Sequence, residues 1–163
     1  MSSIGQFVSF GVGSSRYGID IRSLLEVINM VALTPVPGRP ERPGQRPALA
    51  GLINVRGQVL PVLSMRSLLA LSDAAPTSST RILLVRSETD LVGLTVDSVE
   101  GVVDPEPERL AAVESKAGGD GDEVLSHVYR TESGLILLLD VARLLRSANL
   151  VEIGRAAAES IGS

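Results

Sequence analysis

The sequence contains no cysteine and no tryptophan, and its only aromatic residues are two phenylalanines and two tyrosines. Without cysteine the chain cannot build a disulfide framework or a thiolate metal site. Because aromatic residues are so few, the core must consist of valine, leucine, isoleucine and alanine. This composition favours packed β-structure.

Long apolar runs and positive charge are also scarce. The longest uninterrupted apolar run, Leu135–Leu139, is far too short to span a bilayer. The first ten residues lack the basic region and long apolar run of a signal peptide. A net charge of −4 gives no general attraction for nucleic acid. We therefore expect a soluble, cytoplasmic protein with no nucleic-acid partner and no direct membrane insertion.

The chain is a globular one, with 44% apolar and 21% charged residues in a length of 163. That length fits one domain or two small lobes that share a core. Short apolar runs bounded by turn residues predict mainly β-strands. The predicted strands are Gln6–Val12, Arg16–Ile19, Val27–Val36, Leu49–Val55, Gln58–Met65, Arg81–Arg86, Leu91–Val96, Val99–Val103, Ser126–Arg130 and Gly134–Leu139.

A few short helices are predicted between the strands. Asp20 stands where an N-cap would, and the apolar residues that follow are spaced by three and four up to Ile28. The other helical segments are Met65–Leu71, Arg109–Val113 and a helix that begins at Val141 after Asp140 and could extend through Arg155–Ile161. Helices this short between strands are typical of a barrel with helical plugs rather than of βαβ alternation.

Two polar segments are predicted to be loops. Pro35–Pro47 contains five prolines with arginines between them, which excludes a helix or a central strand. It could be a stiff surface loop or a polyproline ligand for a partner domain. Ser115–Glu123 carries Asp120 and Asp122 but lacks the glycine and glutamate of a calcium loop at the required positions, so we expect a solvated loop.

The most informative local pattern is the join at Arg56-Gly57 between two apolar strands. A charged side chain at the tip of a rigid hairpin is well placed for binding. An arginine that has no binding role and merely precedes a turn glycine at the surface would give the same sequence. The segment alone leaves both interpretations open.

Motifs for catalysis or for cofactor binding are missing. His127 is the only histidine and lies in an apolar run, so we expect a structural role for it. There is no phosphate-binding loop and no hydrolase nucleophile elbow, and Gly11 and Gly13 do not extend into a dinucleotide fingerprint. Asp20 and Asp97 lie at strand ends, where a carboxylate is usually a cap or turn group. We expect no cofactor, no metal site and no catalytic residue.

Four segments, in order, resemble the CheW family of bacterial chemotaxis coupling proteins. These are Tyr17–Ile21 (YGIDI), Gly51–Gly57 (GLINVRG) with Leu60–Leu63 (LPVL), Val92–Val99 (VGLTVDSV), and Leu135–Leu139 with Asp140 and Leu144-Leu145. The resemblance covers about Phe7 to Leu145. It implies two five-stranded β-barrels packed around a shared apolar core, with a few short helices. We place this domain at residues 4–146 and a helical or flexible tail at 147–163.

The resemblance also implies a function. CheW-like proteins are non-enzymatic adaptors of signal transduction that couple the helical hairpin at the cytoplasmic tip of a methyl-accepting chemoreceptor to the regulatory domain of a CheA-type histidine kinase. In the family the receptor lies in a groove between the barrels, lined by the first helix and the N-x-R-G turn. Matched by motif, the groove residues here are Leu24, Glu26, Gly51, Asn54, Arg56 and Gly57.

Two positions depart from the family pattern: Ser64 replaces an aspartate, and His127 stands where the family often has glycine. They suggest as alternatives a divergent scaffold for a pathway with a pilus, biofilm or other non-flagellar output, or an interaction module that serves another kinase or none. A small-molecule-binding barrel or an enzyme with a cryptic site is disfavoured by the single histidine, the absence of cysteine and the missing phosphate loop.

Overall fold

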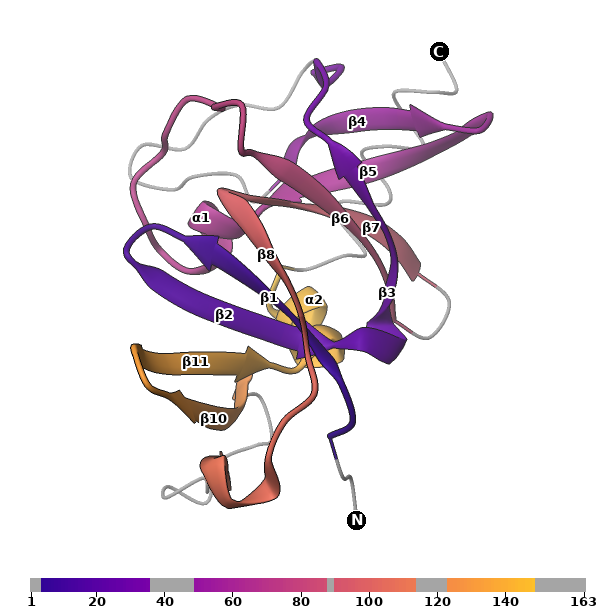
Figure 1. Cartoon of the computed structure of the whole chain (residues 1–163). Helices are drawn as coiled ribbons and strands as arrows, with labels where there is room; N and C mark the ends of the chain where they lie inside the picture. The colour runs from indigo at the N-terminus through magenta and orange to yellow at the C-terminus, as the bar shows by residue number, and fades with distance from the viewer. Residues whose placement is uncertain (1–3, 36–48, 88–89, 114–122, 149–163) are drawn as a thin grey trace.

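The computed structural model describes residues 4–35, 49–87, 90–113 and 123–148, which form two β-sheets (Figure 1). The first sheet, called lobe A below, contains in spatial order β8 (Ser98–Val103), β1 (Phe7–Val12), β2 (Ser15–Asp20), β11 (Gly134–Leu139), β10 (Leu125–Thr131) and β9 (Leu110–Ala112). The second, lobe B, contains β3 (Leu24–Asn29), β6 (Arg81–Ser87), β7 (Asp90–Val96), β5 (Gln58–Ser64) and β4 (Leu49–Val55).

The described helical segments are short. They are α1 (Met65–Leu68), α2 (Val141–Ser147) and the 3₁₀ turns η1 (Ile21–Ser23) and η2 (Pro107–Arg109). The predicted architecture, mainly β with two five-stranded barrels packed around a shared core, is confirmed as two barrel-like sheets, although lobe A has a sixth strand, the three-residue β9. In lobe B the segment after β3 reaches the opposite edge of the sheet, where Thr34 exchanges two backbone hydrogen bonds with Leu52.

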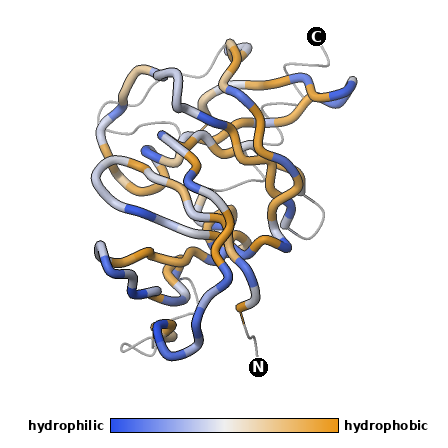
Figure 2. The backbone as a smooth tube through the Cα atoms, in the orientation of Figure 1, coloured by the Kyte–Doolittle hydropathy of each residue, from blue (hydrophilic) through white to orange (hydrophobic). Residues whose placement is uncertain are grey.

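The core consists of three apolar clusters, because many strands bury both of their faces. In β6, for example, Ile82 and Leu84 pack inside lobe B, while Leu83 and Val85 face the shared core between the sheets. Inside lobe A, Phe7 and Tyr129 pack edge to face with ring centroids 5.5 Å apart. Figure 2 shows these hydrophobic stretches meeting in the interior. Such two-sided burial explains the nearly continuous apolar strands of the sequence.

The two lobes exchange strands. The strand β3 follows β2 of lobe A along the chain but pairs with β6 of lobe B. Conversely, β8 follows β7 of lobe B but pairs with β1 of lobe A. Both exchanged strands carry a register shift, between Leu24 and Glu26 in β3 and opposite Ser9 and Phe10 for β8. Each lobe is therefore completed by a segment that is continuous with the other lobe.

A pseudo-twofold repeat relates the lobes. The only parallel pairings in the described sheets are β11 with β2 and β5 with β7, and they bring Leu138 opposite Gly18 and Val62 opposite Gly93. Each glycine lies on the strand of its lobe that pairs with a parallel neighbour. A Cβ atom on Gly18 would lie 2.6 Å from Leu138 Cδ2, and one on Gly93 would lie 2.9 Å from Ile82 Cγ2. Each lobe therefore requires a glycine, which has no side chain, at this equivalent position.

Two predicted helices are wrong. The segment up to Ile28 forms only the single turn η1 before β3 begins at Leu24, because backbone pairing with β6 outweighs an apolar spacing that also fits a helix. Arg109–Val113 is mostly the strand β9, which pairs with β10. The strand predicted for Val27–Val36 ends at Asn29, and beyond it only Thr34 makes a bridge among the described residues.

Asp20 is confirmed as an N-cap, and Ser64 and Asp140 cap the helices that follow them. The side chains of Asp20, Ser64 and Asp140 each accept a hydrogen bond from a backbone N–H in the first turn of η1, α1 and α2. The helix predicted for Met65–Leu71 is shorter and ends before Ala70, whose φ is 58°. The proline-rich segment beyond Pro35, the loop at 114–122 and the extension of the last helix lie outside the described residues.

An ion pair stabilises the segment where the chain passes from β7 of lobe B to β8 of lobe A. Arg66 donates to Asp97 from Nε (3.1 Å) and from a terminal nitrogen (2.7 Å), and the backbone N–H of Gly13 donates to the same carboxylate over 2.8 Å. Partial burial acts to raise the pKa of Asp97, but the hydrogen bonds from Arg66 and Gly13 outweigh it and hold that pKa below its ordinary value of 3.8. Asp97 thereby ties α1, the β1–β2 turn and β8 together.

We predict that Gly18→Ala lowers the free energy of unfolding by about 1–3 kcal/mol, since the added methyl group overlaps Leu138 and the ring of Phe7. Chemical denaturation measures the change. Gly5→Ala is the matched control, because a Cβ on Gly5 meets no atom within 4 Å. Equal stability of the two variants would contradict the close packing at Gly18.

We predict that Asp97→Asn costs about 1 kcal/mol at pH 7, allowing for solvent screening of a pair that is only partly buried. Because the folded pKa of Asp97 lies below its unfolded value, its contribution is complete above pH 3.8 and is lost as the pH falls further. Denaturation curves between about pH 4 and pH 2 should show a steeper loss for the wild type than for Asp97→Asn. The exposed Asp104, changed to Asn, controls for removal of one charge.

Candidate functional site

The turn between β4 and β5 has an unusual backbone. Arg56 has a φ of 51° and Gly57 a φ of 84°, so both residues lie in the left-handed region that a two-residue hairpin of this type needs. Glycine adopts this region freely, whereas arginine does so at a cost in steric energy. Together with Ala70, Arg56 is one of two non-glycine residues with positive φ in the described chain. A strained residue at an exposed tip is a reason to look for a binding role.

The guanidinium of Arg56 is held by a carboxylate from a different part of the sheet. Its two terminal nitrogens donate to the two carboxylate oxygens of Glu26 in β3, over 2.9 and 3.0 Å. The hydrogen bonds from Glu26 raise the pKa of Arg56, which is charged in any case. The Arg56 side chain remains 75% exposed and the Glu26 side chain 35% exposed. The pair is therefore oriented but accessible to another molecule.

Hydrogen bonds bring four of the six predicted site residues together, through the pairs Arg56–Glu26 and Gly57–Asn54. Asn54 is exposed, and its side-chain oxygen accepts a 2.9 Å hydrogen bond from the N–H of Gly57. Gly51 is buried, and a Cβ there would lie 2.9 Å from the carbonyl oxygen of Thr34. Its structural task is thus to let the segment after β3 close lobe B at Leu52.

Leu24, the sixth predicted residue, is partly buried and packs against the shared core. It lies on the strand β3 rather than on a helix, as does Glu26. Its neighbours Leu25 and Val27 are the exposed apolar side chains of this strand, at 48% and 39% exposure. Sequence reasoning missed them because it assumed a helical period; the alternation of period two in β3 would have distinguished them.

The arrangement around Arg56 is suited to binding. A bidentate arginine–glutamate pair can exchange either partner for a charged group of another molecule. The exposed Leu25 and Val27, which alternate with Glu26 along β3, offer apolar contact area. Such an arrangement is suited to recognising a protein surface that is apolar with a few charges.

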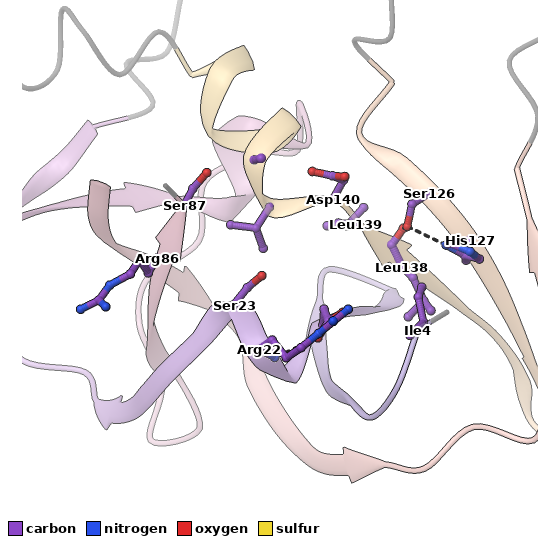
Figure 3. A pocket seen from close by; sticks show the side chains of 13 residues that line it. Ile4, Arg22, Ser23, Arg86, Ser87, Ser126, His127, Leu138, Leu139 and Asp140 are labelled. Carbon is purple, nitrogen blue, oxygen red and sulfur yellow. Dashed lines mark hydrogen bonds and ion pairs between the residues drawn. The ribbon is translucent and has the colours of Figure 1, made fainter. Parts of the chain in front are cut away.

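A depression of about 380 Å³ lies where η1, the end of β6 and the start of α2 meet (Figure 3). Arg22 and Arg86 on its wall are balanced by Asp20 and Asp140, so it offers no net field for an anion. Arg22 is also bound to the Asp20 carboxylate at 2.7 Å. These charges and contacts indicate that the depression is a polar contact region between the lobes.

His127 lines this depression from β10, and its ring nitrogen Nδ1 lies 3.0 Å from Ser126 Oγ. Partial burial lowers the pKa of His127, which favours the neutral ring. Across the pseudo-twofold repeat His127 corresponds to Gly51, since they pair with the equivalent residues Leu138 and Val62. In lobe A that position accommodates a ring, whereas in lobe B the Thr34 backbone occupies the space.

No group of three or more histidine, cysteine, aspartate or glutamate side chains that could hold a metal is found among the residues that the structure describes. The same residues include no helix with the length and hydrophobicity needed to cross a bilayer.

Comparison with known proteins decides the family. A model of the CheW-like domain matches residues 6–149, nearly the whole chain. The chain belongs to the CheW-like family. This confirms the resemblance that its four sequence segments indicated. The family limits agree closely with the described structure, in which α2 ends at Ser147.

Relatives of this CheW-like protein are of similar length. The chemotaxis protein CheW of Helicobacter pylori is 26% identical over 148 residues, covering 86% of this chain and 81% of the relative. The protein FrzA of Myxococcus xanthus is 29% identical over 158 residues, covering 92% and 91%. The crystal structure of the scaffolding protein TtCheW from Thermoanaerobacter tengcongensis superimposes with a TM-score of 0.72 at 23% identity, over 87% of this chain and 92% of that one. The last comparison supports the fold.

We predict that Leu24→Asp and Leu25→Asp separate the two sides of β3. Leu24→Asp should lower the free energy of unfolding by about 2 kcal/mol or more, because it places a charge against the shared core. Leu25→Asp should change it by less than about 0.5 kcal/mol, since Leu25 is exposed. Thermal melting of both variants measures the difference. Equal destabilisation would show that Leu25 is also a core residue.

Proposed function

We propose that this protein is a non-enzymatic adaptor of a bacterial chemosensory array, which couples the cytoplasmic tips of chemoreceptors to a CheA-type histidine kinase. The observation that carries this proposal is the pairing of Arg56 with Glu26 on β3, a strand that also exposes Leu25 and Val27, in a chain of the CheW-like family. The relatives named as chemotaxis proteins favour this function over a pathway with a pilus or biofilm output.

The receptor partner is a helical hairpin. We place its apolar face on Leu25 and Val27, because leucine and valine exposed on a strand can pack against the apolar stripe of a helix. A carboxylate on the receptor can then compete with Glu26 for the guanidinium of Arg56, and a cation can approach Glu26 instead. Binding by exchange of ion pairs fixes the register of the helices without requiring a large free-energy gain.

The second partner is the regulatory domain of the kinase, which the family resemblance implies. We place it away from the Arg56–Glu26 pair, so that one molecule of the adaptor can hold both partners at once. The function requires no reaction at the adaptor itself. A rigid body with two contact surfaces is enough to transmit a change in receptor packing to the kinase.

We predict that Arg56→Ala weakens binding to a chemoreceptor cytoplasmic fragment by about tenfold and leaves binding to the kinase regulatory domain unchanged. Titration calorimetry with each partner measures both affinities. The receptor affinity of the wild type should also fall as salt is raised from low to physiological ionic strength.

Arg130→Ala is the matched control, because Arg130 is an exposed arginine on the equivalent hairpin of lobe A. Circular dichroism should show both variants folded. A folded Arg56→Ala protein with full receptor affinity would remove the proposed receptor site, and loss of both partners together would place Arg56 in the fold rather than at an interface.

A further inference from the structure

We propose that Asn54 is a positioning residue that holds Arg56 in its binding orientation through the backbone of the turn. This inference rests on the proposed function of Arg56. Asn54 is exposed, and its side-chain oxygen accepts the N–H of Gly57 over 2.9 Å. That hydrogen bond spans Arg56 and restrains the two residues whose φ angles are positive.

A second hairpin in the same chain can be compared with this turn. The hairpin β10–β11 of lobe A corresponds to β4–β5, because each has a two-residue turn and a register shift at its far end. The last paired residues before the turns are Val55 with Gln58 in lobe B and Thr131 with Gly134 in lobe A. The two hairpins can therefore be compared position by position.

In the equivalent turn of lobe A, no residue other than glycine has a left-handed backbone conformation. In lobe A positive φ falls on Gly134, at 139°, and neither Glu132 nor Ser133 has one. The barrel architecture therefore does not demand that a non-glycine residue be strained at this place. The strained arginine is a feature of the lobe B hairpin alone.

The hydrogen bond of Asn54 is likewise absent from the equivalent turn. Asn54 pairs with Val59, and the corresponding pair in lobe A is Arg130 with Leu135. An arginine side chain has no acceptor atom for a turn N–H. Lobe A instead stabilises its turn by a hydrogen bond of 2.8 Å from Thr131 Oγ1 to the carbonyl oxygen of Gly134.

The geometry links these observations. With its backbone in the left-handed region, Arg56 reaches Glu26 with both terminal nitrogens. If the turn relaxes, the guanidinium becomes mobile and must be ordered again when a partner binds, which lowers affinity. Asn54 prevents this relaxation, so it acts on the partner through Arg56 and without contact of its own.

A double-mutant cycle tests the inference. We expect Asn54→Ala to weaken receptor-fragment binding by about fivefold in the wild-type background, as the loss of one hydrogen bond predicts. In the Arg56→Ala background the same change should have no further effect, because there is no guanidinium left to position. Arg130→Ala, at the equivalent position, should leave the affinity unchanged.

Two spectroscopic readouts accompany the titrations. The three-bond coupling of the Arg56 amide reports its φ, and the Nε–Hε signal of Arg56 reports the order of its guanidinium. Both should change in Asn54→Ala and return toward the wild-type values in Asn54→Asp, which restores an acceptor for Gly57. Thermal melting checks that every variant is folded.

The outcomes separate this inference from the proposed function. Equal weakening by Asn54→Ala in both backgrounds would mean that Asn54 contacts the partner itself, and would overturn the positioning role. Full affinity of Asn54→Ala together with weak binding by Arg56→Ala would overturn this inference and leave the proposed function standing. Full affinity of Arg56→Ala would overturn both.

Discussion

The exchange of β3 and β8 between the lobes is the constraint on which the rest of the structure depends. Each lobe receives one strand from a segment that continues into the other, so the two sheets cannot be separated without breaking backbone hydrogen bonds. Their inner faces are then held together, and a shared core of mostly aliphatic side chains, with Phe10 and Tyr17, fills the space between them. The Asp97 ion pair reinforces the chain where it crosses back.

The same exchange builds the candidate site. Because β3 comes from lobe A but lies in lobe B, it brings Glu26 within reach of the β4–β5 hairpin. The residues on either side of Glu26 remain exposed. The ion pair thus joins a strand that enters from lobe A to the hairpin of lobe B.

Much of this could be predicted from the sequence. Short apolar runs bounded by turn residues identified nearly every strand, and turn chemistry located the Arg56-Gly57 hairpin. The capping residue Asp20 marked the beginning of η1. The segment from Leu24 to Ile28 was wrong because its apolar residues fit both periods, and only the long-range pairing with β6 selects the strand.

Within the candidate site, motif matching named residues but could not assign the task of each. Asn54, Arg56 and Gly57 are adjacent in sequence, whereas the partner of Arg56 lies thirty residues earlier in a strand that was predicted as helix. Exposure of Leu25 and burial of Leu24 depend on that same strand. The pseudo-twofold repeat was also invisible, since the equivalent glycines Gly18 and Gly93 are embedded in otherwise different sequences.

The crossed strands have a consequence for how such a chain can evolve. A gene that encoded either half alone would yield a sheet lacking one edge strand and carrying an unpaired one that belongs elsewhere. Neither half can be deleted, duplicated or traded for another module by itself. The molecule is therefore inherited as an indivisible unit, in which each half depends on one strand of the other.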